Sequence, residues 1–303
     1  MNTRRISLIL MIFLQSGCQL GCISLTPFET ILDTIPADEF VQIDGQCVHI
    51  ERKGTGEPLI LLHGFGGSTF TFNKVMDGLA DSFDVIAIDL NAFGYTERPT
   101  GTLPYTPRGQ AQLVTAVMDK LDIESAHMLG HSYGAGIALL LAAETPARAR
   151  SLVLVDGIAP RSSSSTVSPL LLPFVSALVQ AFIVNEKTVR DALSASVHDP
   201  DTITEEMVHG YFDRIRVEGL SRGIEGLLGA ANGEPINFDY ANVSQPALII
   251  WGEHDQVIPI TIGEEMNAAL PDSMLIRFTD SGHLPMDEEP EKFIQTVADF
   301  LSE

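Results

Sequence analysis

The 303-residue chain has few cysteines, few basic residues and no long apolar run. Three cysteines with no Cys-x-x-Cys pair exclude a disulfide scaffold and give no sign of a zinc site. Lys and Arg number 18 against 40 Asp and Glu, a formal net charge of −22. A surface this acidic repels phosphate backbones and anionic lipid, so we expect no nucleic-acid partner and no basic membrane patch. Hydrophobic residues make up 45%, which is ample for a core and excludes wholesale disorder.

The first 22 residues have the parts of an export signal. Arg4 and Arg5 precede an apolar run from Ile6 to Leu14, which is too short to span a bilayer, and small residues follow it. The residues before Cys18 and before Cys22 resemble the site at which bacterial lipoproteins are cleaved and acylated. We therefore expect export to the bacterial cell envelope. The protein is then either periplasmic or secreted, or a lipoprotein tethered to the membrane through Cys18 or Cys22.

From about residue 38 onward the chain alternates predicted strands and helices. Residues 40–52 read as a hairpin with Asp44-Gly45 at its turn. Six apolar runs are typical of strands buried on both faces: 58–63, 84–90, 126–129, 151–155, 247–251 and 273–278. Helical stretches separate most of them: 70–80, 109–121, 133–143, 262–270 and 290–301. This alternation predicts an α/β fold with a mainly parallel sheet and helices on both of its faces.

The alternation stops between the strands predicted at 151–155 and 247–251. Helix-prone segments fill this interval, at 170–184, 189–196 and 205–215. We predict that residues 160–240 form a helical cap over one end of the sheet, inserted between two parts of the core at 38–159 and 241–303. The apolar stripe in 170–184 either covers a pocket for an acyl chain as a lid or packs the cap onto the core.

Two glycine-rich turns follow predicted buried strands. GHSYG (130–134) is a G-x-S-x-G between a strand and a helix, the setting in which this motif makes a sharp turn with an exposed serine hydroxyl. HGFGG (63–67) follows an earlier predicted strand, and a glycine-rich turn at this place lets backbone N–H groups face a substrate oxygen. We predict Ser132 as a nucleophile, with the N–H groups of Phe65 and Tyr133 as an oxyanion hole. The alternative is that both are ordinary glycine-rich turns.

A serine hydroxyl needs a base to take its proton, and eight histidines are available. His283 follows the last predicted strand, at the sheet edge where ligand chemistry occurs in open α/β folds, and we predict it as the base. His131 adjoins the serine, but we expect its side chain to point elsewhere on the sharp turn. We expect His63 to hold the oxyanion loop. His254 stays a rival.

The base in turn needs a carboxylate that fixes its tautomer. Asp255 follows the strand before the last one and is the predicted acid. Glu253 lies at a different point of the same turn, and Asp156, which ends the strand at 151–155, stays an alternative. Asp89 precedes the nucleophile, and we expect it to cap the loop that follows it. We expect Asp287 and the two glutamates after it to cap the last helix.

The order Ser132, Asp255, His283 is that of the α/β-hydrolase fold, and from about residue 40 the sequence resembles this superfamily. Five motifs carry the resemblance: HGFGG (63–67), DLNAFGYTERP (89–99), GHSYG (130–134), WGEHDQVIP (251–259) and SGHLPMDEEP (281–290). It implies an eight-stranded sheet with the helical cap inserted after strand six. It also implies a serine hydrolase that cleaves a small-molecule or lipid ester through a Ser-His-Asp triad and an acyl-enzyme. Such an esterase or lipase needs no metal and no organic cofactor.

Two other functions stay open. Hydrolases of carbon–carbon bonds in dienoic diketones are similar in fold, cap and triad, although their nucleophile turn usually differs from GHSYG. A non-catalytic ligand-binding protein on the same fold is the second alternative. The serine itself separates the chain from similar dehalogenases and epoxide hydrolases, which have an aspartate at this position.

Overall fold

The computed structural model describes residues 25–159, 185–231, 236 and 238–302. Its centre is an eight-stranded sheet with the spatial order β1-β2-β4-β3-β5-β6-β7-β8. The strands are β1 (Phe40–Ile43), β2 (Gln46–Lys53), β3 (Glu57–Leu62), β4 (Phe83–Ile88), β5 (Ala126–His131), β6 (Ala149–Val155), β7 (Ala247–Gly252) and β8 (Ser273–Phe278). β2 pairs antiparallel with β1 and β4, and the pairs from β4 to β8 are parallel. The predicted mainly parallel sheet is confirmed.

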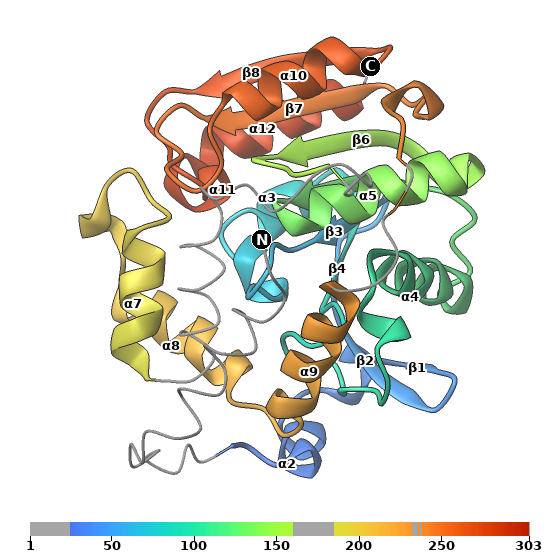
Figure 1. Ribbon diagram of the computed structural model, residues 1–303, viewed down its shortest axis with the longest axis vertical. Coiled ribbons are helices and arrows are strands. Elements are labelled where there is room, and N and C mark those ends of the chain that lie inside the picture. Colours follow the sequence, from blue (N-terminus) through green and yellow to red (C-terminus); the bar gives the residue numbers. More distant parts are fainter. Residues whose placement is uncertain (1–24, 160–184, 232–235, 237, 303) are drawn as a thin grey trace, which may run out of the picture.

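Helices flank the sheet on both faces (Figure 1). They are α3 (Met76–Ala80), α4 (Pro107–Lys120), α5 (Tyr133–Glu144), α10 (Thr261–Ala269) and α12 (Pro290–Leu301). Successive side chains of a strand point to opposite faces, so β3 divides its apolar residues between two cores. Ile60 and Leu62 pack with α4, α5 and α10, whereas Leu59 and Leu61 pack with α3 and α12. The long apolar runs in the sequence follow from this burial on both faces.

Most predicted helices lie within a few residues of their expected positions. The helix expected at 70–80 is instead a 3-10 turn, η2 (Thr69–Phe72), followed by the short α3. Ser68 begins that turn with a capping box, which starts a new element there. Two short helices were not expected, α2 (Phe28–Thr34) and α11 (Pro285–Glu288). No helix among the described residues is long and apolar enough to cross a membrane.

Three described helices lie between β6 and β7: α7 (Glu186–Ser194), α8 (Glu205–Ile215) and α9 (Leu220–Ala231). The first two were expected and α9 was not. Asn185 and Thr204 begin α7 and α8, because their side chains accept N–H groups of the first turn. Figure 1 places α7 and α8 beyond the carboxyl ends of the strands. The apolar segment 170–184 lies outside the described residues, as does the export segment 1–22, so both stay predictions, as do the limits of the cap.

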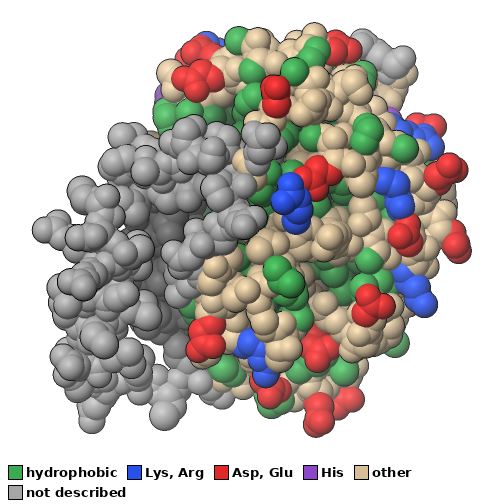
Figure 2. Space-filling view, turned by 45° about the vertical axis from the view of Figure 1, so that its right-hand side comes forward, with side chains coloured by type: hydrophobic (Ala, Val, Ile, Leu, Met, Phe, Trp, Pro, Cys, Tyr) green, Lys and Arg blue, Asp and Glu red, His purple; other side chains and the backbone are tan. Residues whose placement is uncertain are grey.

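The acidic excess of the sequence is visible on the molecular surface. On the face shown in Figure 2, Asp and Glu side chains lie scattered among fewer Lys and Arg side chains. Several of the basic residues are engaged by acidic neighbours, as Arg108 is by Glu144 and Arg148 by Asp119. Exposed pairs of this kind contribute little to stability.

Candidate active site

Ser132 occupies a sharp turn between β5 and α5. Its φ of 52° and ψ of −112° lie outside the regions that L-residues prefer, a strain of about 1–3 kcal/mol that is typical of functional turns. The surrounding backbone is so close that only glycine fits. A Cβ on Gly134 would lie 2.1 Å from Leu62 O, and one on Gly130 would lie 2.5 Å from Ala135 N. Gly134 therefore lets the turn pack against the end of β3, and Gly130 lets it fold back onto the first residues of α5.

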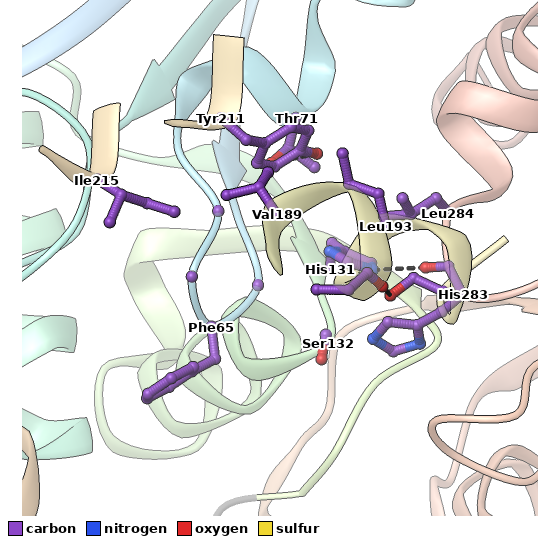
Figure 3. Close-up of a pocket in the computed structure, with 15 residues that line it drawn as sticks. Phe65, Thr71, His131, Ser132, Val189, Leu193, Tyr211, Ile215, His283 and Leu284 are labelled. Carbon is purple, nitrogen blue, oxygen red and sulfur yellow. Dashed lines mark hydrogen bonds between the residues drawn. The ribbon is translucent and has the colours of Figure 1, made fainter. Parts of the chain in front are cut away.

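His283 and Asp255 meet at the carboxyl ends of β8 and β7. Nδ1 of His283 lies 2.7 Å from Oδ2 of Asp255, and the two side chains are 4% and 0% exposed. Oδ1 of Asp255 accepts the N–H groups of Val257 at 2.7 Å and Ile258 at 3.0 Å, which fixes the carboxylate. Because an ionised carboxylate only accepts, Nδ1 carries the imidazole proton and Nε2 is left as an acceptor. His283 and Ser132 line the same pocket (Figure 3).

Asp156, the alternative acid, lies in the same cluster. One ligand atom from each of Asp156, Asp255 and His283 falls within 4.8 Å of the others, the only such cluster in the part of the chain that the structure describes. Asp156 is fully buried with a φ of 43°, and its Oδ1 accepts Gly252 N–H at 2.9 Å. Burial, together with the nearby Asp255 carboxylate, raises the pKa of Asp156 well above its usual value. The carboxylate bonded to the imidazole is that of Asp255.

The loop after β3 is fixed at both ends. Nε2 of His63 accepts Leu90 N–H at 3.0 Å, so Nδ1 carries the proton and donates to Gly64 O at 2.7 Å. Burial lowers the pKa of His63, in keeping with this neutral form. At the other end, Oδ1 of Asp89 accepts Thr69 N–H at 2.6 Å. His63 thus holds the loop as expected. Asp89 also caps its following loop, since its Oδ2 accepts Tyr95 N–H at 2.7 Å.

The two residues predicted to supply the oxyanion hole, Phe65 and Tyr133, pack against each other through their side chains. Phe65 belongs to the loop just described, and Tyr133 is the first residue of α5, where backbone N–H groups have no partner inside the helix. Their rings pack edge to face with centroids 6.3 Å apart. The N-terminal end of α5 adds a favourable dipole for a developing negative charge.

The positions of two histidines, His131 and His254, differ from what the sequence indicates. His131 was expected to point elsewhere, but it lines the pocket, and its Nε2–H donates to His283 O at 2.8 Å. Burial and the neighbouring His283 hold the pKa of His131 well below its usual value. The rival base His254 is exposed and stacks on His198 with ring centroids 3.7 Å apart. It is not among the described residues that line the pocket.

The sequence predicts that the acidic residues after His283 cap the last helix, but the structure shows a different role for them. Among the described residues no side-chain hydrogen bond caps this helix. Oε1 of Glu289 accepts Ser281 Oγ–H at 2.9 Å, and Oε1 of Glu288 accepts Gly282 N–H at 2.8 Å. Both glutamates therefore fold back onto the loop that carries His283. Their position five and six residues after the histidine, across a proline, is the only signal in the sequence for this role.

The pocket combines a polar floor with an apolar wall (Figure 3). It encloses about 640 Å³ of space, including the part open to solvent. Ser132, His131 and His283 lie at one side. The wall consists mainly of side chains from α7, α8 and two loops: Phe65, Val189, Ala192, Leu193, Ile215 and Leu284. Tyr211 adds a hydroxyl that donates to Thr71 Oγ1 at 3.3 Å.

A family model described as alpha/beta hydrolase fold matches residues 57–290. The chain belongs to this family. Among its relatives, an uncharacterized hydrolase of Bacillus subtilis (strain 168), YugF, is 32% identical over 263 residues, which cover 86% of this chain and 96% of the relative. A 2-hydroxy-6-oxononadienedioate/2-hydroxy-6-oxononatrienedioate hydrolase of a Pseudomonas species is 30% identical over 276 residues, with 86% and 93% covered.

Solved structures of this alpha/beta hydrolase family agree with the fold. An esterase from Exiguobacterium antarcticum superimposes with a TM-score of 0.74 at 23% identity, over 87% of this chain and 99% of the esterase. An identity this low supports the fold alone. The family and its relatives make the protein a hydrolase, and the bond that it cleaves is a separate question.

Proposed function

We propose that the protein is a serine hydrolase of carboxylic esters, an esterase or lipase. One observation carries the proposal: the hydrogen bond of 2.7 Å that joins Asp255 to His283, which lines the same pocket as the strained Ser132. This bond makes Nδ1 the donor and Nε2 the acceptor nitrogen of the imidazole, as the base of a serine hydroxyl requires. The pattern of nucleophile, base and carboxylate is the one that activates serine on several unrelated folds.

The reaction proceeds in two steps, acylation of Ser132 and hydrolysis of the acyl-enzyme. Ser132 Oγ bonds to the ester carbonyl carbon while Nε2 of His283 takes its proton, and the N–H groups of Phe65 and Tyr133 hold the oxyanion. The C–O bond of the ester then breaks, and His283 gives the proton to the leaving alkoxide. In the second step, water bonds to the acyl carbon while His283 takes one of its protons. The bond between the acyl carbon and Ser132 Oγ then breaks, and His283 returns the proton to Oγ, which releases the acid and the free serine. The charge of Asp255 stabilises the imidazolium in both steps.

The apolar wall favours an uncharged acyl group as the bound part of the substrate. Val189, Leu193 and Leu284 present hydrocarbon to the space beside Ser132. Burying a hydrocarbon chain there gains about 0.8 kcal/mol per CH₂. A carboxylate against the same wall would lose its hydration, and no Lys or Arg is among the described residues that line the pocket.

Cleavage of a carbon–carbon bond is the second candidate, because the Pseudomonas relative at 30% identity is named as a dienedioate hydrolase. The same serine, base and acid suit either reaction. The dienedioate substrate named for that relative carries two carboxylates, and the apolar wall of this pocket does not favour them. We therefore rank the ester first.

A substrate panel with a matched variant tests the proposal. The wild type and Ser132→Ala are assayed on p-nitrophenyl esters of graded acyl length and on a dienoic diketone acid, and both are treated with a fluorophosphonate probe. Ester turnover and labelling in the wild type alone support the proposal. Cleavage of the diketone without ester turnover supports the second candidate. Neither turnover nor labelling in the wild type would indicate a binding protein.

We also propose that residues 1–22 direct export, with a lipid on Cys18 or Cys22. The charged end, the short apolar run and the small residues before each cysteine support this. Incorporation of labelled palmitate into the full chain and into Cys18→Ser and Cys22→Ser identifies the acylated residue. Absence of label from the exported full chain would contradict the lipid anchor, and retention in the cytoplasm would contradict export.

A further inference from the structure

The loop that carries His283 is bound by the region inserted between β6 and β7. The His283 N–H donates to the carbonyl oxygen of Ser196, just after α7, at 2.6 Å. A few atoms away, Oε2 of Glu288 accepts His198 N–H at 2.6 Å, while Oε1 accepts Gly282 N–H at 2.8 Å. One carboxylate therefore joins the segment 196–198 to the residue next to the histidine.

The two backbones fit without spare room. A Cβ added to Gly282 would lie 2.7 Å from Ser196 O and 2.8 Å from His198 N. On the far side, His131 donates to the His283 carbonyl oxygen at 2.8 Å. Both backbone polar groups of His283 are thus held, the N–H by the inserted segment and the C=O by the nucleophile turn. A shift of the segment 196–198 has to move the histidine.

The carboxylate form of Glu288 suits the two hydrogen bonds that link His198 to Gly282. It is partly buried in α11, and burial raises its pKa, whereas the N–H groups of His198 and Gly282 act in the opposite direction. Both of its oxygens accept from backbone N–H groups. An amide in this place would turn an NH₂ group toward one of those N–H groups and lose that bond.

We propose that Glu288 is a positioning residue, which aligns His283 with Ser132 by clamping the base loop to the inserted segment at residues 196–198. The inference rests on the proposed function, in which His283 exchanges a proton with Ser132. Its physical basis is the sensitivity of proton transfer to geometry, since a misplacement of about 1 Å costs on the order of 100-fold in rate.

The test is Glu288→Gln in the full chain, with active-site titration. A fluorophosphonate probe counts the competent sites, and kcat, KM and the labelling rate are then expressed per site. We expect kcat per titrated site and the labelling rate to fall together by about 10- to 100-fold, with KM nearly unchanged and labelling still complete at long times. Glu291→Gln, on the exposed side of α12, removes the same charge and is the control; it should behave as wild type.

Glu288→Asp is the second variant, because it keeps the charge but is one methylene too short to reach both N–H groups. It should lie between the wild type and Glu288→Gln, and it keeps the test available if the latter does not fold. An unchanged kcat per titrated site in both variants, with only a lower melting temperature or a smaller labelled fraction, overturns the inference in favour of a structural role. A wild type that neither labels nor turns over ester fails the proposed function itself, and the inference with it.

Discussion

His131 donates a hydrogen bond from Nε2 to the carbonyl oxygen of His283 at 2.8 Å, across 152 positions of sequence. The two ring centroids lie 4.8 Å apart. The residue that precedes the proposed nucleophile thereby holds the residue proposed to activate it. Because burial and the neighbouring His283 hold the pKa of His131 well below its usual value, it stays a neutral donor at neutral pH. The nucleophile turn and the base loop form one unit.

Replacing His131 with Leu should weaken both stability and rate. The His283 carbonyl would lose its donor, which costs about 1–3 kcal/mol for a buried group, and the looser base loop should lower kcat roughly 10-fold. Urea unfolding and kcat per titrated site measure the two effects. His131→Gln keeps a terminal N–H donor and should recover part of each loss. A Leu variant as active and as stable as wild type would show that this hydrogen bond is dispensable.

Asp255→Asn should lower kcat by about 10³- to 10⁴-fold with the fold intact, because an amide favours the wrong imidazole tautomer. Circular dichroism and thermal unfolding check the fold, and ester turnover gives kcat. Asp156→Asn is the matched variant, an equal change in the adjacent carboxyl group, and it should keep most of the activity since Asp255 contacts the imidazole. The reverse ranking would assign the acid to Asp156.

His63→Leu should disturb the oxyanion loop rather than substrate binding. The imidazole joins Gly64 O to Leu90 N–H, and Leu can do neither. Misplacing one oxyanion donor costs about 10²- to 10³-fold in kcat, so we expect kcat to fall toward that range with little change in KM. Steady-state kinetics on a p-nitrophenyl ester separate the two constants. A change confined to KM would place the loop in binding instead.

The sheet and the residues of the candidate site could be predicted because each corresponds to a local pattern in the sequence. Continuous apolar runs reveal strands buried on both faces. The nucleophile turn is readable from GHSYG because only glycine fits at 130 and 134, where an added Cβ would lie 2.5 Å and 2.1 Å from another backbone atom. The loop histidine His63 could likewise be inferred from its place at a strand exit.

The sequence did not predict α9 or the role of Glu288, because both depend on residues that are distant in the chain. α9 contains Gly223, Gly226 and Gly229, which weigh against a helix in isolation. In the fold they allow close packing, since a Cβ on Gly226 would lie 2.1 Å from the ring of Tyr105. Glu288 likewise reads as a helix cap locally, but one of its partners, His198, lies 90 positions earlier in the chain. Neither contact leaves a local pattern.

Asp287 should make the free energy of unfolding depend on pH. Burial raises the pKa of this carboxyl group from 3.8 to about 6, although Lys74, with Nζ 3.5 Å from Oδ1, opposes the shift. Between these values the folded chain keeps a proton that the unfolded chain has lost, so stability falls as pH rises from about 4 to 6 and this group adds no further change above 6. The loss is about 2–3 kcal/mol.

Asp287→Asn removes the titrating group and should remove that slope. Urea unfolding of the wild type and the variant at pH 4, 5, 6 and 7.5 gives the difference in free energy at each pH. We expect the variant to gain relative to the wild type up to pH 6, because only the wild type must take up a proton on folding in this range. Asp299→Asn, an exposed carboxylate on α12, is the reference for a surface substitution. A difference that is constant from pH 4 to 7.5 would mean that pairing with Lys74 balances the burial of Asp287, and one that moves in favour of the wild type would mean that the pairing outweighs the burial; either result would contradict the raised pKa.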